Sequence, residues 1–217
     1  MQLPGEGSSY RRLVIFGLYL LKRLIRAKLP AMADDVAKAT AHVKATGRVV
    51  EDHEEPVQGA LAERDSVDDG LDDTAQNARS ALAGRSADAN TKEPYTLIFG
   101  VGILYYTAAA APLDQEAKRY GELELLVEKH LPETDEVRDK VVDGVTTGLK
   151  EFDDAMKDLA KVEGALTGVD TDLTKAEEAW SRLAEKTYGE LVALFGRAKA
   201  ERFFPKRRKR KRRGKGV

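Results

Sequence analysis

The feature that most constrains the fold is a run of apolar residues with helical spacing between positions 137 and 162. Apolar side chains recur there every three to four residues over 25 positions, which is the period of an α-helix. The members of this stripe are Val137, Val141, Val145, Leu149, Phe152, Met156, Leu159 and Val162. Similar spacing covers most of the chain, and the alternation typical of β-strands is nearly absent. The sequence therefore predicts an all-α fold, an antiparallel helical bundle with long amphipathic helices.

Helical spacing also predicts the individual helices of this bundle. Proline lacks a backbone N–H, so Pro56 should end one helix and begin another. A turn at 167–170, followed by the capping-box residues Thr174 and Glu177, should fold the flanking helices into an antiparallel hairpin. Residues 84–94, GRSADANTKEP, are typical of a loop. The predicted helices are 10–28, 33–50, 56–83, 114–131, 134–163 and 172–204.

Residues 95–112 form an uncharged stretch of eighteen residues, YTLIFGVGILYYTAAAAP. Eighteen apolar residues are the lower limit for a membrane span, and this stretch contains tyrosine, threonine and glycine. We therefore expect 95–111 to be the central apolar helix of the bundle, on which the hairpin packs. A buried strand at 96–101 and insertion into a membrane are the alternatives. Insertion would make membrane contacts of Ile98, Phe99, Ile103 and Leu104, together with Phe203 and Phe204 near the C-terminus.

Charge divides the chain into three parts, although 36 Lys and Arg nearly balance 37 Asp and Glu. Residues 1–31 carry a net charge of +5, residues 32–205 carry −15 and residues 206–217 carry +9. The predicted organisation is a basic segment at 1–31, an acidic helical bundle at 32–204 and a disordered polycationic tail at 205–217. Three interpretations of the basic segment are open. It could be a helix that lies on an anionic membrane, a secretory signal, which it resembles poorly, or a stretch that precedes the native start at Met32.

The polycationic tail is the strongest chemical signal in the sequence. Its repelling charges are relieved only by solvent or by a polyanion. We expect salt-sensitive binding to nucleic acid or anionic lipid, without recognition of base sequence. Contact of the tail with the protein's own acidic bundle, including self-association, is a further prediction. The predicted polyanion-binding residues are Lys206, Arg207, Arg208, Lys209, Arg210, Lys211, Arg212, Arg213 and Lys215.

Two short motifs receive less weight. Asp68, Asp69 and Asp72 have the carboxylate spacing that holds magnesium diphosphate in helical prenyl-transfer enzymes, but an acidic chain produces such runs by chance. We interpret them as a solvated acidic face. Gly144 and Gly148 could admit a neighbouring helix, but they lie outside any membrane-length apolar run, and we interpret their spacing as incidental.

The sequence thus favours a non-enzymatic helical scaffold or interaction protein that binds a polyanion through its tail. No cofactor and no small-molecule substrate are expected, and the expected location is cytoplasmic with possible membrane association. The absence of cysteine excludes a disulfide framework and a thiolate site. A membrane-acting helical protein that inserts 95–111 is the first alternative. A magnesium-dependent enzyme built on the three aspartates is the second.

Overall fold

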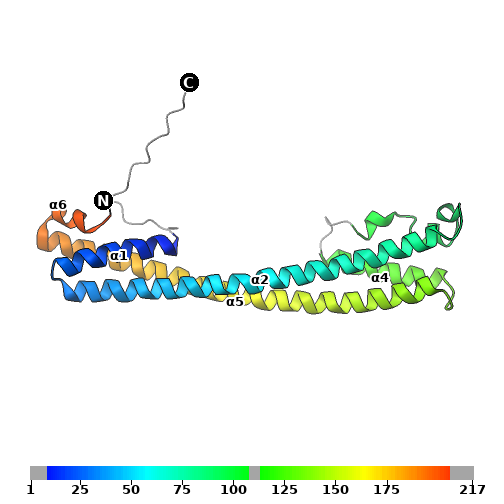
Figure 1. The fold of residues 1–217 in the computed structure, drawn as a ribbon, viewed down its shortest axis with the longest axis horizontal. Coiled ribbons are helices and arrows are strands. Elements are labelled where there is room, and N and C mark those ends of the chain that lie inside the picture. The colour runs from blue at the N-terminus through cyan, green and yellow to red at the C-terminus, as the bar shows by residue number, and fades with distance from the viewer. Residues whose placement is uncertain (1–8, 108–112, 206–217) are drawn as a thin grey trace, which may run out of the picture. The chain divides into compact units, whose positions relative to one another are not determined.

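The structure is a computed structural model that describes residues 9–107 and 113–205, and this part of the chain is all-α, as predicted (Figure 1). Within these residues, three 3₁₀ turns accompany the α-helices, at Ala89–Thr91, Ile103–Tyr105 and Glu201–Phe203. The α-helices are α1 (Tyr10–Arg26), α2 (Pro30–Ala83), α3 (Tyr95–Ile98), α4 (Leu113–His130), α5 (Glu136–Phe195) and α6 (Arg197–Ala200).

α2 is one uninterrupted helix, so the predicted break at Pro56 is wrong. An interior proline removes one backbone hydrogen bond. The apolar face nevertheless continues on both sides of it, because Val50 packs against one core and Val57 is buried. This packing outweighs the local preference for a break.

α5 is also continuous, and the predicted hairpin of 134–163 and 172–204 is wrong. The hydroxyl of Thr171 donates to the carbonyl of Thr167 at 2.9 Å, and that of Thr174 donates to the carbonyl of Asp170 at 3.1 Å. These hydroxyls therefore bond back into α5, and Thr174 does not cap a new helix. Gly168 is tolerated inside the helix at a cost of about 1 kcal/mol.

The apolar segment that follows the 84–94 loop is not the predicted central helix. Within 95–107 the chain forms the four-residue α3, a turn and a 3₁₀ turn, while 108–111 lie outside the described residues. α3 ends at Ile98, and Gly102 turns the chain before the 3₁₀ turn with φ of +86°, a conformation that glycine adopts readily. The Tyr106 hydroxyl then donates to the carbonyl of Ile98 at 2.9 Å, which folds the segment back on itself.

The helices form two compact units, each with its own hydrophobic core. Unit 1 comprises 1–55 and 164–217, and unit 2 comprises 56–163. In unit 1, α1 packs on the first part of α2 and the last part of α5 (Figure 1). In unit 2, α3 and α4 pack on the remaining parts of α2 and α5.

The core of unit 1 is centred on Trp180. Its indole N–H donates to the Thr40 hydroxyl at 3.1 Å, and its ring meets the ring of Phe16 edge-on at 6.2 Å. A Cβ at Gly17 would lie 2.1 Å from the Thr40 oxygen, so α1 can approach α2 here only because position 17 lacks a side chain. Leu20 is fully buried beside them. The helix α1 is thus part of the core of unit 1.

Unit 2 is held by fully buried residues of α4, such as Leu123, packed against α2 and α5. A Cβ at Gly148 would lie 2.6 Å from Leu71, and one at Gly144 would lie 2.9 Å from Thr74. Both glycines of α5 therefore admit α2 at close range. The interpretation of their spacing as incidental is wrong.

Candidate polyanion-binding site

A small cationic pocket lies in unit 1 where the end of α1 meets the segment after α5. Its volume is about 250 Å³. Arg23, Arg26 and Ala27 line it from α1, and Lys199, Arg202 and Phe203 line it from the C-terminal side. We refer to these six residues as the cationic pocket.

Two chain reversals bring these residues together. After α1 the backbone turns at Lys28, whose φ is +57°, and the Leu29 N–H donates to the carbonyl of Leu24 at 3.1 Å. α5 ends at Phe195, and Gly196 turns the chain with φ of +73°. Because glycine adopts this conformation without strain, α6 and the following turn fold back toward α1.

In the part of the chain that the structure describes, aromatic rings and not carboxylates lie next to the charges of the pocket. The Arg23 guanidinium lies 5.9 Å from the centroid of the Phe203 ring, and the Lys199 amine lies 4.4 Å from that of Phe195. Among the described residues that line the pocket none is acidic, and its four cations form no ion pair within 9–107 and 113–205. Four cations around one small cavity produce a local field that favours an anion.

The polycationic tail predicted from the sequence, Lys206 to Lys215, lies outside the described residues. Phe203 and Phe204, which precede it, are buried in the core of unit 1. Both side chains therefore pack inside unit 1, close to the start of the tail.

The candidate membrane contacts of the apolar segment are mostly buried in unit 2. Ile98 and Phe99 belong to its core and Ile103 packs against it, whereas Leu104 is 72 % exposed. In the described part of the chain, no helix is both long enough and apolar enough to cross a bilayer.

The aspartates of the metal-like motif lie on α2 in unit 2. The Tyr120 hydroxyl donates to Asp72, and Asp69 is exposed. Burial raises the pKa of Asp68, and the nearby charges of Asp72 and Asp69 raise it further. A raised pKa disfavours the ionised form that a metal requires. Within the described residues, no group of three or more acidic or histidine side chains could hold a metal ion.

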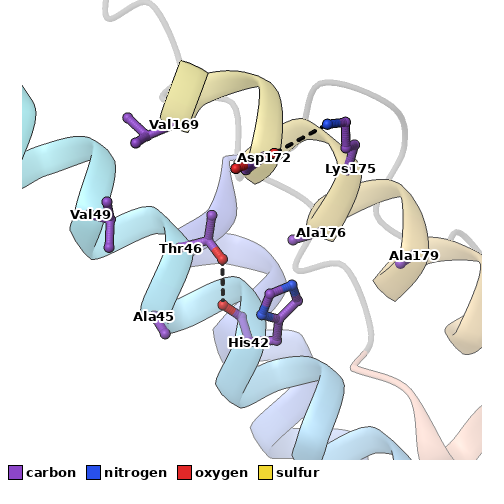
Figure 2. A pocket seen from close by; sticks show the side chains of 9 residues that line it. All are labelled: His42, Ala45, Thr46, Val49, Val169, Asp172, Lys175, Ala176 and Ala179. Carbon is purple, nitrogen blue, oxygen red and sulfur yellow. Dashed lines mark hydrogen bonds and ion pairs between the residues drawn. The ribbon is translucent and has the colours of Figure 1, made fainter. Parts of the chain in front are cut away.

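A larger groove of about 530 Å³ lies between α2 and α5 in unit 1 (Figure 2). Small side chains such as Ala45, Ala176 and Ala179 leave it open. Its charged lining residues, Asp172 and Lys175, pair with each other at 3.2 Å. The groove therefore offers a largely apolar surface, to which His42 and Thr46 add polar groups.

Sequence reasoning missed the cationic pocket because it continued the last helix to 204. The signal was Gly196, a typical residue just after a helix end, followed by Arg197, Lys199 and Arg202. No protein-family model, curated protein or solved structure matches the chain.

Proposed function

We propose that this protein is a helical interaction protein that binds polyanions through the cationic pocket of unit 1 and the tail that follows it. The observation that carries the proposal is the gathering of Arg23, Arg26, Lys199 and Arg202 around one cavity, with no ion pair to any residue of 9–107 or 113–205. The cationic run of the tail begins at Lys206, three residues after Phe203 of the pocket. Pocket and tail together offer thirteen cations to an extended array of phosphates or similar anions.

The distribution of charge along the chain supports this proposal. Residues 56–163, which form unit 2, hold 12 Lys and Arg against 23 Asp and Glu. By contrast, residues 10–28 hold six basic residues and no acidic one, and residues 206–217 hold nine. A polyanion is therefore attracted to these two basic segments and repelled by unit 2.

Binding of this kind has a thermodynamic signature. Neutralising phosphates releases condensed counterions, so the logarithm of the binding constant falls linearly with the logarithm of salt concentration. For about five neutralised phosphates the slope is about −4.5. Binding should vary little with base sequence, because interactions with phosphates carry no base information.

The test measures binding of the full chain to a fluorescent DNA duplex as a function of NaCl concentration. Deleting 206–217 should abolish most salt-sensitive binding. Changing the four pocket cations to glutamine should make the slope shallower by about 0.9 for each phosphate that the variant no longer neutralises. The matched control changes four exposed lysines of unit 2 to glutamine and should leave the slope unchanged. These are Lys118, Lys129, Lys150 and Lys161.

Two outcomes contradict the proposal. One is binding that the tail deletion and the pocket variant leave intact. The other is an equally weakened binding in the unit 2 control, since that would mean that only the total charge of the protein matters.

A further inference from the structure

The outer face of α1 carries a pattern that polyanion binding alone does not require. Four of its large apolar side chains are exposed, Ile15 at 69 %, Leu18 at 49 %, Tyr19 at 41 % and Ile25 at 59 %. A bundle helix usually exposes polar residues on the face that points away from its core. The exposed apolar residues of α1 therefore call for a separate explanation.

Cations occupy the same face. With about 100° between successive residues of a helix, all exposed positions of α1 fall within one face roughly 140° wide. The core residues Leu13, Leu20 and Leu24 lie on the opposite side. The exposed positions are Arg11, Arg12, Ile15, Leu18, Tyr19, Lys22, Ile25 and Arg26. We refer to these eight residues as the outer face of α1.

Three of the four cations on this face have no ion-pair partner among the described residues. Arg11 pairs with Glu51, but Arg12, Lys22 and Arg26 form no ion pair within the described part of the chain. The 17 residues of α1 include no Asp or Glu. The face thus combines positive charge with exposed apolar side chains, and Arg26 also lines the cationic pocket.

We infer that unit 1 docks on an anionic phospholipid membrane, with the outer face of α1 lying in the interface and the cationic pocket taking lipid phosphate groups. This inference rests on the proposed function and narrows its partner to a lipid surface. A helix of this composition binds in the plane of the interface, where apolar side chains enter the acyl boundary and cations meet the headgroups. A nucleic acid would neutralise the cations but would leave Ile15, Leu18 and Ile25 exposed to water.

The docking leaves the fold of unit 1 intact. Leu20 and Leu24 stay in the core while Ile15 and Leu18 enter the interface, since the two pairs lie on opposite sides of α1. Unit 1 therefore binds the membrane without unfolding, and no segment has to cross the bilayer.

The experiment is flotation of the full chain with vesicles of phosphatidylcholine that contain about one third phosphatidylserine. The double variant Ile15→Gln/Leu18→Gln should weaken binding by about tenfold or more, because it removes apolar area from the interface. Its matched control, Leu104→Gln/Leu125→Gln, removes two comparably exposed apolar residues from unit 2, which are 72 % and 66 % exposed, and should bind as the parent does.

A second variant tests the charges of the same face. Arg12→Gln/Lys22→Gln should weaken binding about thirtyfold at low salt, because each cation near an anionic surface strengthens binding about fivefold. Neutral phosphatidylcholine vesicles should not bind the protein. All changed side chains are exposed, so circular dichroism should show unaltered helix content in each variant.

The DNA-binding assay separates this inference from the proposed function, because the apolar variant leaves the pocket and the tail unchanged. A chain that binds DNA with the expected salt slope but does not float with anionic vesicles would overturn the inference and leave the proposed function standing. Flotation that disappears in the Leu104/Leu125 control, or that is equal for neutral vesicles, would also overturn it. Flotation that disappears only in the α1 variants would support it.

Discussion

Units 1 and 2 have the same arrangement of three long helices, but the third helix of each unit differs in composition. Each unit packs one further long helix on a pair made of α2 and α5, α1 in unit 1 and α4 in unit 2. α4 has the composition of an ordinary bundle helix, with five acidic and three basic residues. α1 has four exposed large apolar residues, five basic residues and no acidic one. The described side chains of α4 fill the same structural role without this pattern, which supports our proposal that the outer face of α1 binds a partner.

The largest expected effect is the loss of stability on truncating a core leucine, and it tests whether the two cores unfold independently. Leu20 in unit 1 and Leu123 in unit 2 are both completely buried, so changing either to alanine should cost about 2–5 kcal/mol of stability. Trp180 is the only tryptophan and lies in unit 1, so its fluorescence reports on that unit. In urea, Leu20→Ala should lower the midpoint of the fluorescence transition. Leu123→Ala should leave that midpoint nearly unchanged and should lower the midpoint of the transition measured by circular dichroism. Equal shifts of the fluorescence midpoint in both variants would mean that the chain unfolds as one cooperative body.

A smaller effect should distinguish the close helix packing in unit 2 from its open surface. A side chain at Gly148 meets the buried Leu71, so Gly148→Ala should destabilise the protein by about 1–3 kcal/mol through overpacking. Gly121 in α4 has open space around it, and Gly121→Ala should stabilise the protein by up to about 1 kcal/mol. Thermal melts of the two variants should therefore shift in opposite directions. A stabilising Gly148→Ala would contradict the close approach of α2 and α5.

The smallest expected effect is the electrostatic cost of Asp68 in acidic unit 2. Burial raises the pKa of Asp68, and the charges of Asp72 and Asp69 raise it further. The folded protein therefore binds the carboxyl proton of Asp68 more tightly than the unfolded chain does. Ionised Asp68 therefore opposes folding at neutral pH, and this cost disappears as the pH falls below the ordinary value of 3.8. Asp68→Asn should raise the melting temperature by about 1–3 °C at pH 7. The difference from the parent should shrink at acid pH; a difference that grows there would refute the raised pKa.

The comparison also shows what the sequence could and could not predict. Periodic apolar residues correctly predicted the all-α class, the helix at 10–28 and the stripe of 137–162, because burial of a helix face is a local pattern. The predicted break at Pro56 was wrong because packing on both sides of it outweighs the local cost of the proline. The predicted turn at 167–170 was wrong because the hydroxyls of Thr171 and Thr174 bond back into a continuous α5.

The candidate site was only partly accessible to sequence reasoning. The positive charge of the tail and of residues 10–28 can be read directly from the sequence. The cationic pocket depends on the reversal at Gly196, which joins Arg23 and Arg26 to Lys199 and Arg202 across more than 170 positions of sequence. The outer face of α1 could be recognised only when the structure showed which of its apolar residues the core uses.

The most direct test of the central claim compares one labelled position in each unit. The chain has no cysteine, so Ile15→Cys or Leu125→Cys introduces a single site for an environment-sensitive fluorophore at a similarly exposed position. On addition of phosphatidylserine-containing vesicles, the label at position 15 should show a blue-shifted and stronger emission that high salt reverses, while the label at 125 should not respond. An unchanged label at position 15, or an equal response at position 125, would contradict the account.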